Sequence, residues 1–244
     1  MTPHPPEERE PRISIIIPCR DDQAGLDEAI ASILAQSEQD FEVIVVDDGS
    51  DPPVTTDPDP RIKVLRNSAP RGPAHARNRG IVAARGEIIA FCDSDDVYAP
   101  GRLQAIAKAH LESPLVVCRQ GTLGATNHAR AARFRRSNGR SPLDATTPAL
   151  GATSVKRGFC LPFDETFLAC QDIEWWIRTL SGGLRPVYVD HLGYLFRRSD
   201  RPRLLNSHRA RLEFSYLLLQ VHDEYFGSSH LSGHRPRSSG WAEA

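Results

Sequence analysis

The chain has 244 residues, of which 40% are hydrophobic and 25% are charged, and its formal net charge at pH 7 is −1. This composition is typical of a globular protein, and the length suits one sizeable domain better than two. The balanced charge offers no overall field that would attract nucleic acid, and the sequence has no run of 18 apolar residues that could span a membrane.

The cysteines and the two ends of the chain indicate the compartment. Five cysteines, an odd number with no CxxC pair, favour buried thiols in a reducing compartment over a zinc site. Residues 1–12 are rich in Pro and Glu and lack the apolar stretch of a secretory signal, so we expect a flexible N-terminal segment. Residues 227–244 are rich in Ser, Gly, His and Arg, which predicts a flexible tail. We therefore predict a cytoplasmic protein, with peripheral membrane contact as an open alternative.

The first half of the chain alternates predicted strands with predicted helices. Short apolar runs rich in β-branched residues predict buried strands, and apolar residues at helical spacing predict amphipathic helices. This alternation predicts an α/β fold, with a mostly parallel central sheet and helices on both of its faces. Strands are expected at 13–17, 41–46, 61–66 and 87–92, and helices at 24–36, 73–84 and from Pro100 onward.

The second half is less regular, and residues 116–148 support no assignment. Within that stretch, residues 130–140 are strongly basic, which predicts a solvated loop or, alternatively, a surface that contacts the acceptor or a membrane. Because no linker is evident, we predict a single domain over 13–226, divided into halves at 13–110 and 111–226. The remaining elements are expected at 151–155 (strand), 171–180 (helix), 185–189 (strand) and 204–225 (helix).

Three of the predicted strands end in polar or acidic residues. The first is followed by Pro18-Cys-Arg-Asp-Asp22, the second by Asp47-Asp48 and the fourth by Asp93-Ser-Asp95-Asp96. Parallel sheets bind their ligands at the carboxyl ends of the strands, so these groups should lie along one edge of the sheet.

The acidic cluster after the fourth strand is the strongest chemical signal. Crowded carboxylates repel one another and persist where a cation lies among them, and hard oxygen ligands suit Mg²⁺ or Mn²⁺. The alternative is a helix N-cap and turn before Pro100, which needs one carboxylate and not three. Asp47-Asp48-Gly49-Ser50 is either a plain turn or a place where one carboxylate accepts hydrogen bonds from a base or ribose.

Two helical segments add charged and aromatic side chains. Arg77 and Arg79 could face phosphate oxygens, or they form a solvated basic helix face. Asp172 could act as a general base, or it complements the dipole at the start of its helix. Trp175 and Trp176 cannot both face one side of a helix, so we expect one in the core and the other lining a cleft where it stacks on a sugar.

In order and spacing, these segments resemble the family-2 glycosyltransferases over about residues 13–110. The resemblance implies the GT-A fold, a Rossmann-like sandwich that binds one nucleotide sugar, together with inversion at the anomeric carbon and a divalent cation, Mn²⁺ or Mg²⁺. The matching segments are Ile13-Ser-Ile-Ile-Ile-Pro18, Leu26 with Ile33-Leu-Ala-Gln36, Phe41-Glu-Val-Ile-Val-Val-Asp-Asp-Gly-Ser50, Gly72, Ala76-Arg-Asn78, Gly80, Gly86-Glu-Ile88 and Phe91-x-Asp93-Ser-Asp95-Asp96.

The resemblance makes 13–110 the nucleotide-binding half. It implies that Asp93 and Asp95 form the DxD pair, with Asp95 as the direct metal ligand, whereas Asp96 is a neighbour without an assigned role. Pro18 and Arg20 are expected to line the nucleotide pocket, and Asp48 is expected to contact the base. The complete set expected to bind the nucleotide sugar is Pro18, Arg20, Asp48, Arg77 and Asp93.

The acceptor half, 111–226, resembles the family more loosely. Phe163-Asp-Glu165 followed by Gln171-Asp172-x-x-Trp175 resembles the acceptor-side segment, whose general base corresponds to Asp172. Family members usually have Glu-Asp where this chain has Gln171-Asp172. Arg197-Arg198 resembles a basic pair that helps to neutralise the leaving diphosphate, with a solvated loop as the alternative. His191 could reach the metal, although a structural histidine is the simpler interpretation.

The predicted reaction is a direct, metal-dependent displacement. The acceptor attacks the anomeric carbon of a nucleotide diphosphate sugar, expected to be a UDP-sugar, while Asp172 takes the proton. The acceptor itself (a glycan, a lipid-linked sugar, a small molecule or a peptide) is not indicated. One alternative is a degenerate member that binds a nucleotide sugar or a partner without turnover. The other is a nucleotidyltransferase, but the loop from Pro18 to Gly25 lacks the several glycines typical of that class.

Overall fold

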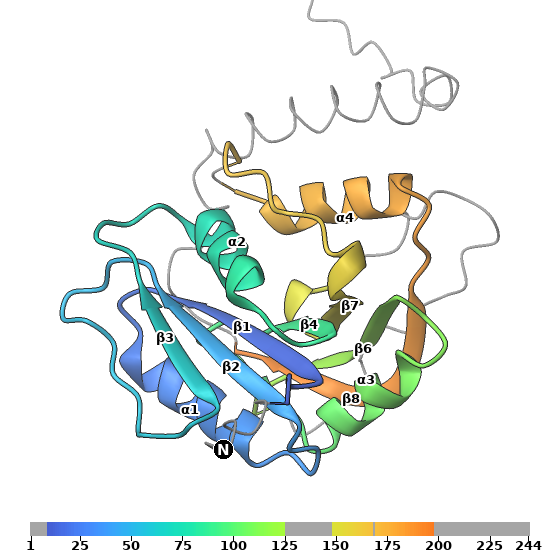
Figure 1. The fold of residues 1–244 in the computed structure, drawn as a ribbon, viewed down its shortest axis with the longest axis horizontal. Helices are drawn as coiled ribbons and strands as arrows, with labels where there is room; N and C mark the ends of the chain where they lie inside the picture. Colours follow the sequence, from blue (N-terminus) through green and yellow to red (C-terminus); the bar gives the residue numbers. More distant parts are fainter. Residues whose placement is uncertain (1–8, 125–147, 168, 198–244) are drawn as a thin grey trace, which may run out of the picture. The chain divides into compact units, whose positions relative to one another are not determined.

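A computed structural model describes residues 9–124, 148–167 and 169–197, which build one eight-stranded sheet with helices packed on it (Figure 1). The chain divides into two units after Arg201, and all described residues belong to the first unit. Four predicted features lie outside the described residues: most of the N-terminal segment, the basic run 130–140, the helix 204–225 and the tail 227–244.

The sheet has the strand order β3-β2-β1-β4-β7-β6-β8-β5. Its first four strands run parallel to one another, and β8 runs parallel to β6. Strand β7 pairs antiparallel with both β4 and β6, and β5 pairs antiparallel with β8. The strands are β1 (Ile13–Cys19), β2 (Phe41–Asp47), β3 (Ile62–Arg66), β4 (Ile88–Phe91), β5 (Val97–Tyr98), β6 (Leu115–Thr122), β7 (Thr153–Lys156) and β8 (Val187–Phe196).

Helices cover both faces of this sheet. Figure 1 shows α2 and α4 over one face, and α1 and α3 over the other. The predicted α/β architecture with a mostly parallel sheet is therefore confirmed. The helices are α1 (Gln23–Leu34), α2 (Pro73–Ala83), α3 (Arg102–Ala109) and α4 (Gln171–Ser181).

The second half departs from its predicted elements. Strand β6 lies in the stretch without an assignment, and β8 continues well beyond the predicted strand at 185–189. The predicted strand at 151–155 is divided into a 3-10 turn, Leu150–Ala152, followed by β7. Helix α3 begins later than Pro100, because Gly101 adopts a left-handed conformation (φ 78°) before the first helical turn.

Close packing between α2 and β1 brings this helix near the carboxyl edge of the sheet. A Cβ atom on Gly80 would lie 2.5 Å from Cγ2 of Ile16, so only glycine allows the observed approach. Strands β1 and β2 beneath the helix are almost entirely buried, as expected for the centre of a parallel sheet. Helix α2 therefore carries Arg77, one turn before Gly80, to the end of β4.

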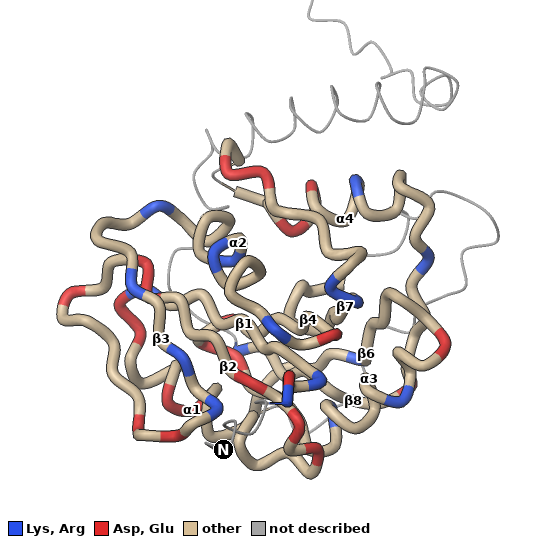
Figure 2. Tube along the Cα trace, in the orientation of Figure 1, with Lys and Arg blue, Asp and Glu red and all other residues tan. Residues whose placement is uncertain are grey.

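Charges of both signs are spread over the elements, without a single strongly basic or acidic face on the side drawn in Figure 2. This distribution agrees with the formal net charge of −1. Of the helices that the structure describes, none is both long and apolar enough to cross a membrane.

Candidate active site

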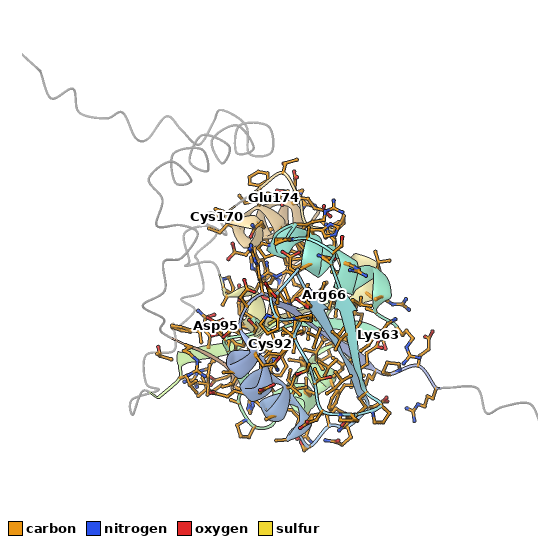
Figure 3. The ribbon with its side chains drawn as sticks, turned by 90° about the vertical axis from the view of Figure 1, so that its left-hand side faces the viewer. Lys63, Arg66, Cys92, Asp95, Cys170 and Glu174 are labelled. Atoms are coloured by element: carbon orange, nitrogen blue, oxygen red, sulfur yellow. The ribbon has the colours of Figure 1, made fainter. Side chains whose placement is uncertain are left out.

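The strand ends meet along one edge, as the sequence predicts. Cys19, at the end of β1, is paired in register with Asp47, at the end of β2, and the amide of Asp48 donates to the Cys19 carbonyl at 2.9 Å. Beyond β4, the amide of Cys92 donates to the carbonyl of Ile16 at 3.1 Å. In Figure 3, Cys92 and Asp95 lie at these strand ends, below the start of α4, which Cys170 immediately precedes and in which Glu174 lies.

Residues 93–96, which we call the acidic turn, follow β4 directly. The side chains of Asp93 and Asp95 are half-buried, whereas Asp96 is 7% exposed. Burial raises the pKa of Asp95, and the nearby Asp93 carboxylate raises it further. The edge of the sheet therefore holds two neighbouring carboxylates whose negative charges repel each other.

Asp96 points into the protein and has a structural role that the sequence did not indicate. One carboxylate oxygen accepts a short hydrogen bond from the Tyr194 hydroxyl, and the other accepts from the amide of Arg197 at 2.7 Å. Burial raises the pKa of Asp96 to about 7, against hydrogen bonds that lower it. Asp96 thus ties the acidic turn to the end of β8 and leaves two acids facing the sheet edge.

Arg77 connects α2 to the acidic turn. Its Nη2 donates to Oδ1 of Asp93 at 2.7 Å, and its guanidinium lies 5.6 Å from the centre of the Phe163 ring. The side chain is only 9% exposed, and its buried Nε has no hydrogen-bond partner within the described residues. A buried guanidinium with an unused donor is suited to binding an anionic group.

Asp172 lies in the first turn of α4, which starts after Cys170 in a left-handed conformation (φ 58°). Burial raises the pKa of the Asp172 carboxyl; the positive charge of Arg77 opposes this shift, and the negative charge of Asp93 adds to it. Asp172 is therefore within electrostatic reach of both side chains. A carboxyl group with a raised pKa in a half-buried position is suited to take up a proton.

The two acids at the end of β2, Asp47 and Asp48, both form hydrogen bonds within the fold. Asp47 forms a short ion pair with Arg66 and accepts from the amides of Ser50 at 2.8 Å and Val54 at 3.3 Å. Burial favours the neutral form of Asp47, but these hydrogen bonds outweigh it and lower the pKa. Of the two interpretations of Asp47-Asp48-Gly49-Ser50, the plain turn therefore fits Asp47, whose carboxylate is used within the turn.

Asp48 holds the loop that leads into α2. Its carboxylate accepts from the side chain of Asn67 at 2.6 Å and from the amides of Arg71 at 2.9 Å and Gly72 at 2.7 Å. The side chain is buried, with the residue 5% exposed. Its predicted contact with a base stays a prediction, and its role in holding the loop is one that the sequence pattern did not reveal.

Pro18 and Arg20 lie at the end of β1, on the predicted side of the sheet. Pro18 is half-buried and is in register with Val46 of β2. Arg20 is exposed, and its Nε lies 3.4 Å from a carboxylate oxygen of Asp21. Both positions lie at the edge where the acidic turn begins, as the assignment to a nucleotide pocket requires. The assignment itself remains a prediction.

The structure corrects the interpretation of the two tryptophans. Trp175 is fully buried and Trp176 is 2% exposed, and their rings meet edge to face with centroids 5.6 Å apart. We expected one tryptophan in the core and the other lining a cleft. Both lie in the core, so the expected cleft position is wrong. The physical reason is that Phe163 and Phe91 pack against Trp175 and turn this end of α4 into core.

Arg197 is engaged at the end of β8. Its Nε donates to the carbonyl of Asp95 at 3.1 Å, and Nη2 forms a short ion pair with Glu28 of α1. Its predicted role at the diphosphate stays a prediction, and Arg198 lies outside the described residues. The Nε2 of His191 donates to the carbonyl of Pro100 at 3.0 Å, in agreement with a structural histidine.

Three further residues matter to the site although the sequence did not single them out. Tyr194 binds Asp96, and Asn78 and Glu165 connect α2 to the segment that precedes α4. Asn78 and Glu165 fall within segments that resemble the family, which was the only available signal. Nothing in the sequence pairs Tyr194 with Asp96, because the two are 98 positions apart.

A hollow on the opposite edge of the sheet has no place in this site. It is lined by residues that precede β1 and β4, including Arg12 and Glu87, and by the turn 156–159 after β7. Ligands of parallel sheets bind at the carboxyl ends of the strands, so we give this hollow no catalytic role.

The described residues contain no group of three or more His, Cys, Asp or Glu side chains arranged to hold a metal ion. Asp93 and Asp95 nevertheless fit the kind of site in which Mg²⁺ or Mn²⁺ binds one or two carboxylates together with substrate phosphates. Burial, and after it the repulsion from Asp93, raises the pKa of Asp95, and a bound cation would favour the ionised form against both effects.

Comparison with known proteins gives a consistent result. The model of the family described as Glycosyl transferase family 2 matches residues 14–157. One curated relative is WfgD of Escherichia coli, described as a UDP-Glc:alpha-D-GlcNAc-diphosphoundecaprenol beta-1,3-glucosyltransferase. It is 36% identical over 96 residues, which cover 38% of this chain and 38% of WfgD. The chain spans less than half the length of the curated relatives that it matches.

Two solved structures share the fold at low sequence identity. S. aureus TarS in complex with UDP-GlcNAc aligns with a TM-score of 0.71 and 19% identity, over 87% of this chain and 66% of that chain. The mannosyltransferase PcManGT from Pyrobaculum calidifontis, in complex with GDP-Man and Mn²⁺, aligns with a TM-score of 0.62 and 18% identity, over 94% and 67%. These alignments confirm the predicted GT-A fold.

Proposed function

The chain belongs to glycosyltransferase family 2, and on this premise we propose that it transfers a sugar from a nucleotide diphosphate sugar to an acceptor at the acidic turn. We assign donor binding to the half 13–110 and acceptor binding to the half 111–226 of a domain spanning 13–226. The proposed reaction inverts the anomeric carbon and depends on a divalent cation.

The main support for this proposal is the meeting of three groups from separate parts of the chain. Asp93 follows β4, Arg77 reaches it from α2 at 2.7 Å, and Asp172 lies within electrostatic reach of both from α4. Asp93 offers a carboxylate that can bind a metal ion, and Arg77 offers a guanidinium that can bind a phosphate. Asp172 offers a carboxylate that can accept a proton. A sugar transfer from a diphosphate needs these same three functions.

In the proposed reaction, Asp172 acts as the general base. An acceptor oxygen forms the new bond to the anomeric carbon, the bond from that carbon to the diphosphate oxygen breaks, and Asp172 takes the acceptor proton. The half-buried position and the raised pKa of Asp172 suit this role, because a more basic carboxylate accepts a proton more readily. Arg77 and Arg197 are the residues we assign to charge neutralisation on the departing diphosphate.

Asp93 and Asp95 are the residues that would hold Mn²⁺ or Mg²⁺, with Asp95 as the direct ligand. When bound, the cation would supply positive charge for the diphosphate. The structure of PcManGT with GDP-Man and Mn²⁺ lends support, since that protein shares this fold.

We propose a UDP-sugar as the donor. TarS was solved with UDP-GlcNAc, and WfgD is described as a transferase that uses UDP-Glc and a diphosphoundecaprenol-linked acceptor. A lipid-linked acceptor is one candidate for this chain, alongside glycans, small molecules and peptides. Pro18, Arg20 and Asp48 are proposed to contact the nucleotide.

A calorimetric titration with UDP, GDP, CDP and dTDP, each with and without Mn²⁺, tests the donor site. We expect one nucleotide to bind, to require the metal, and to lose the metal-dependent part of its affinity in Asp95→Ala. The matched control is Asp190→Ala, which removes an acid whose side chain is 89% exposed. If the folded protein binds none of the four nucleotides, the proposal is wrong. Binding without any sugar transfer would indicate the degenerate alternative.

A further inference from the structure

A short strip of chain, residues 161–165, lies between α2 and α4 and contacts both helices. It precedes α4 in sequence, yet its polar contacts reach back to α2, about 85 positions earlier. Because α2 carries Arg77 and α4 carries Asp172, this strip lies in the structural connection between two groups of the proposed site.

Asn78 binds the strip with its whole side-chain amide. Its Nδ2 donates to the carbonyl of Phe163 at 2.9 Å, and the amide of Phe163 donates back to Oδ1 at 2.7 Å. The same Nδ2 also donates to Oε1 of Glu165 at 2.9 Å. Both donors and one acceptor of the amide are therefore used, and the paired bonds fix Phe163 as a neighbouring strand would.

Glu165 extends this attachment along α2. Its Oε2 lies 2.9 Å from Nδ1 of His75 and 3.7 Å from Nη2 of Arg71. The hydrogen bond from Asn78, followed by that from His75, lowers the pKa of the Glu165 carboxyl, so it is ionised at neutral pH. Asn78 and Glu165 together attach the strip to the first two turns of α2.

The other side of the strip carries α4. The Phe163 ring stacks on Trp175 with centroids 5.8 Å apart and planes 18° from parallel, and Nε1 of Trp175 donates to the carbonyl of Leu161 at 2.8 Å. Nη2 of Arg178 donates to the carbonyl of Pro162 at 2.8 Å. Trp175 lies one turn after Asp172, so the strip and the start of α4 are packed as one body.

We propose that Asn78 is a positioning residue: by clamping Phe163, it sets the place of α4 and hence of Asp172 relative to Arg77 and Asp93. Asn78 does not touch the reacting atoms. The inference rests on the proposed function, in which Asp172 is the base. It accounts for the neighbouring positions of Arg77 and Asn78 on α2, because the first binds the acidic turn while the second binds the strip.

The test compares Asn78→Ala with wild type by hydrogen exchange, nucleotide titration and kinetics. We expect faster amide exchange confined to 161–181, with the strands of 13–47 unchanged. Nucleotide affinity with Mn²⁺ should stay within about twofold, while kcat falls about 10- to 100-fold, as expected for a small misplacement of a catalytic group. In an Asp172→Asn background, Asn78→Ala should cause no further loss of kcat. Val82→Ala, an 86% exposed position on the same helix, is the matched control.

Each outcome decides the proposal. Unchanged exchange in 161–181, equal losses of affinity and kcat, or an undiminished effect in the Asp172→Asn background would overturn it. Asn78→Asp keeps the shape and the acceptor for Phe163, and it serves in the same test if Asn78→Ala does not fold. If the wild type transfers no sugar, the proposed function fails, whereas the exchange measurement still decides whether Asn78 holds the strip and α4.

Discussion

Replacing Asp96 by asparagine should remove a pH dependence of stability that arises from this single buried acid. The pKa of Asp96 is about 7 in the folded protein, against an ordinary value of 3.8. A raised pKa means that the folded state retains a proton that the unfolded chain has already released. The contribution of this proton to the free energy of unfolding is fully present below about pH 4, and it is lost as the pH rises through 7.

The size of the effect follows from the shift. One pKa unit corresponds to about 1.4 kcal/mol, so ionisation of Asp96 should cost the folded state about 4 kcal/mol by pH 8, of which about 2 kcal/mol accrues between pH 5 and 7. An asparagine side chain would keep the shape and an oxygen for the Arg197 amide, but it cannot ionise. The stability of Asp96→Asn relative to wild type should therefore rise by about 2 kcal/mol between pH 5 and 7.

Urea unfolding at pH 5, 6, 7 and 8, with EDTA present, measures this difference. Asp190→Asn is the control, because the side chain of Asp190 is 89% exposed and should show no comparable trend. A constant difference between wild type and Asp96→Asn across this range would refute a proton held by Asp96. A difference that falls with pH would mean that the bonds from Tyr194 and Arg197 outweigh burial.

Three other substitutions have defined outcomes. Asp172→Asn should lower kcat by about 10²- to 10⁴-fold with nucleotide affinity retained, and loss of both would contradict its role as base. In the wild type, kcat should decline as the pH falls through the raised pKa of Asp172, since the base must be ionised; a pH-independent kcat would argue against this. Gly80→Ala should destabilise the fold by about 1–3 kcal/mol in urea unfolding, because its Cβ would lie 2.5 Å from Ile16, while Val82→Ala should change it by less than about 0.5 kcal/mol. Gly151→Ala should be at least as costly, since its Cβ would lie 1.9 Å from Cζ of Tyr194, and a stable variant would show that this ring can move.

The sequence alone was sufficient for the parallel half of the fold. The segments 13–17, 41–46 and 87–92 are mostly apolar and rich in β-branched or aromatic residues, and such runs form the buried strands of a parallel sheet. Since strands of that kind place their carboxyl ends together, the position of the acidic turn at the sheet edge also followed from local pattern. Strand β6 and most of β8 were missed, because polar residues and glycine interrupt their apolar runs, with Arg, Gln and Gly in β6 and Asp, His and Gly in β8. Both strands are fixed by pairing with strands distant in sequence, including each other.

The roles of individual acids were decided by tertiary structure. The sequence left Asp96 without a role, whereas in the structure it is bound by Tyr194 and by the amide of Arg197, which lies 101 positions further along the chain. Trp175 and Trp176 are likewise both buried, against expectation. The rings of Phe91 and Phe163, distant in sequence, pack on Trp175, and Trp175 in turn packs on Trp176. The physical reason is the same in each case: a charge or ring takes its function from burial and partners, and those come from residues that local pattern cannot bring together.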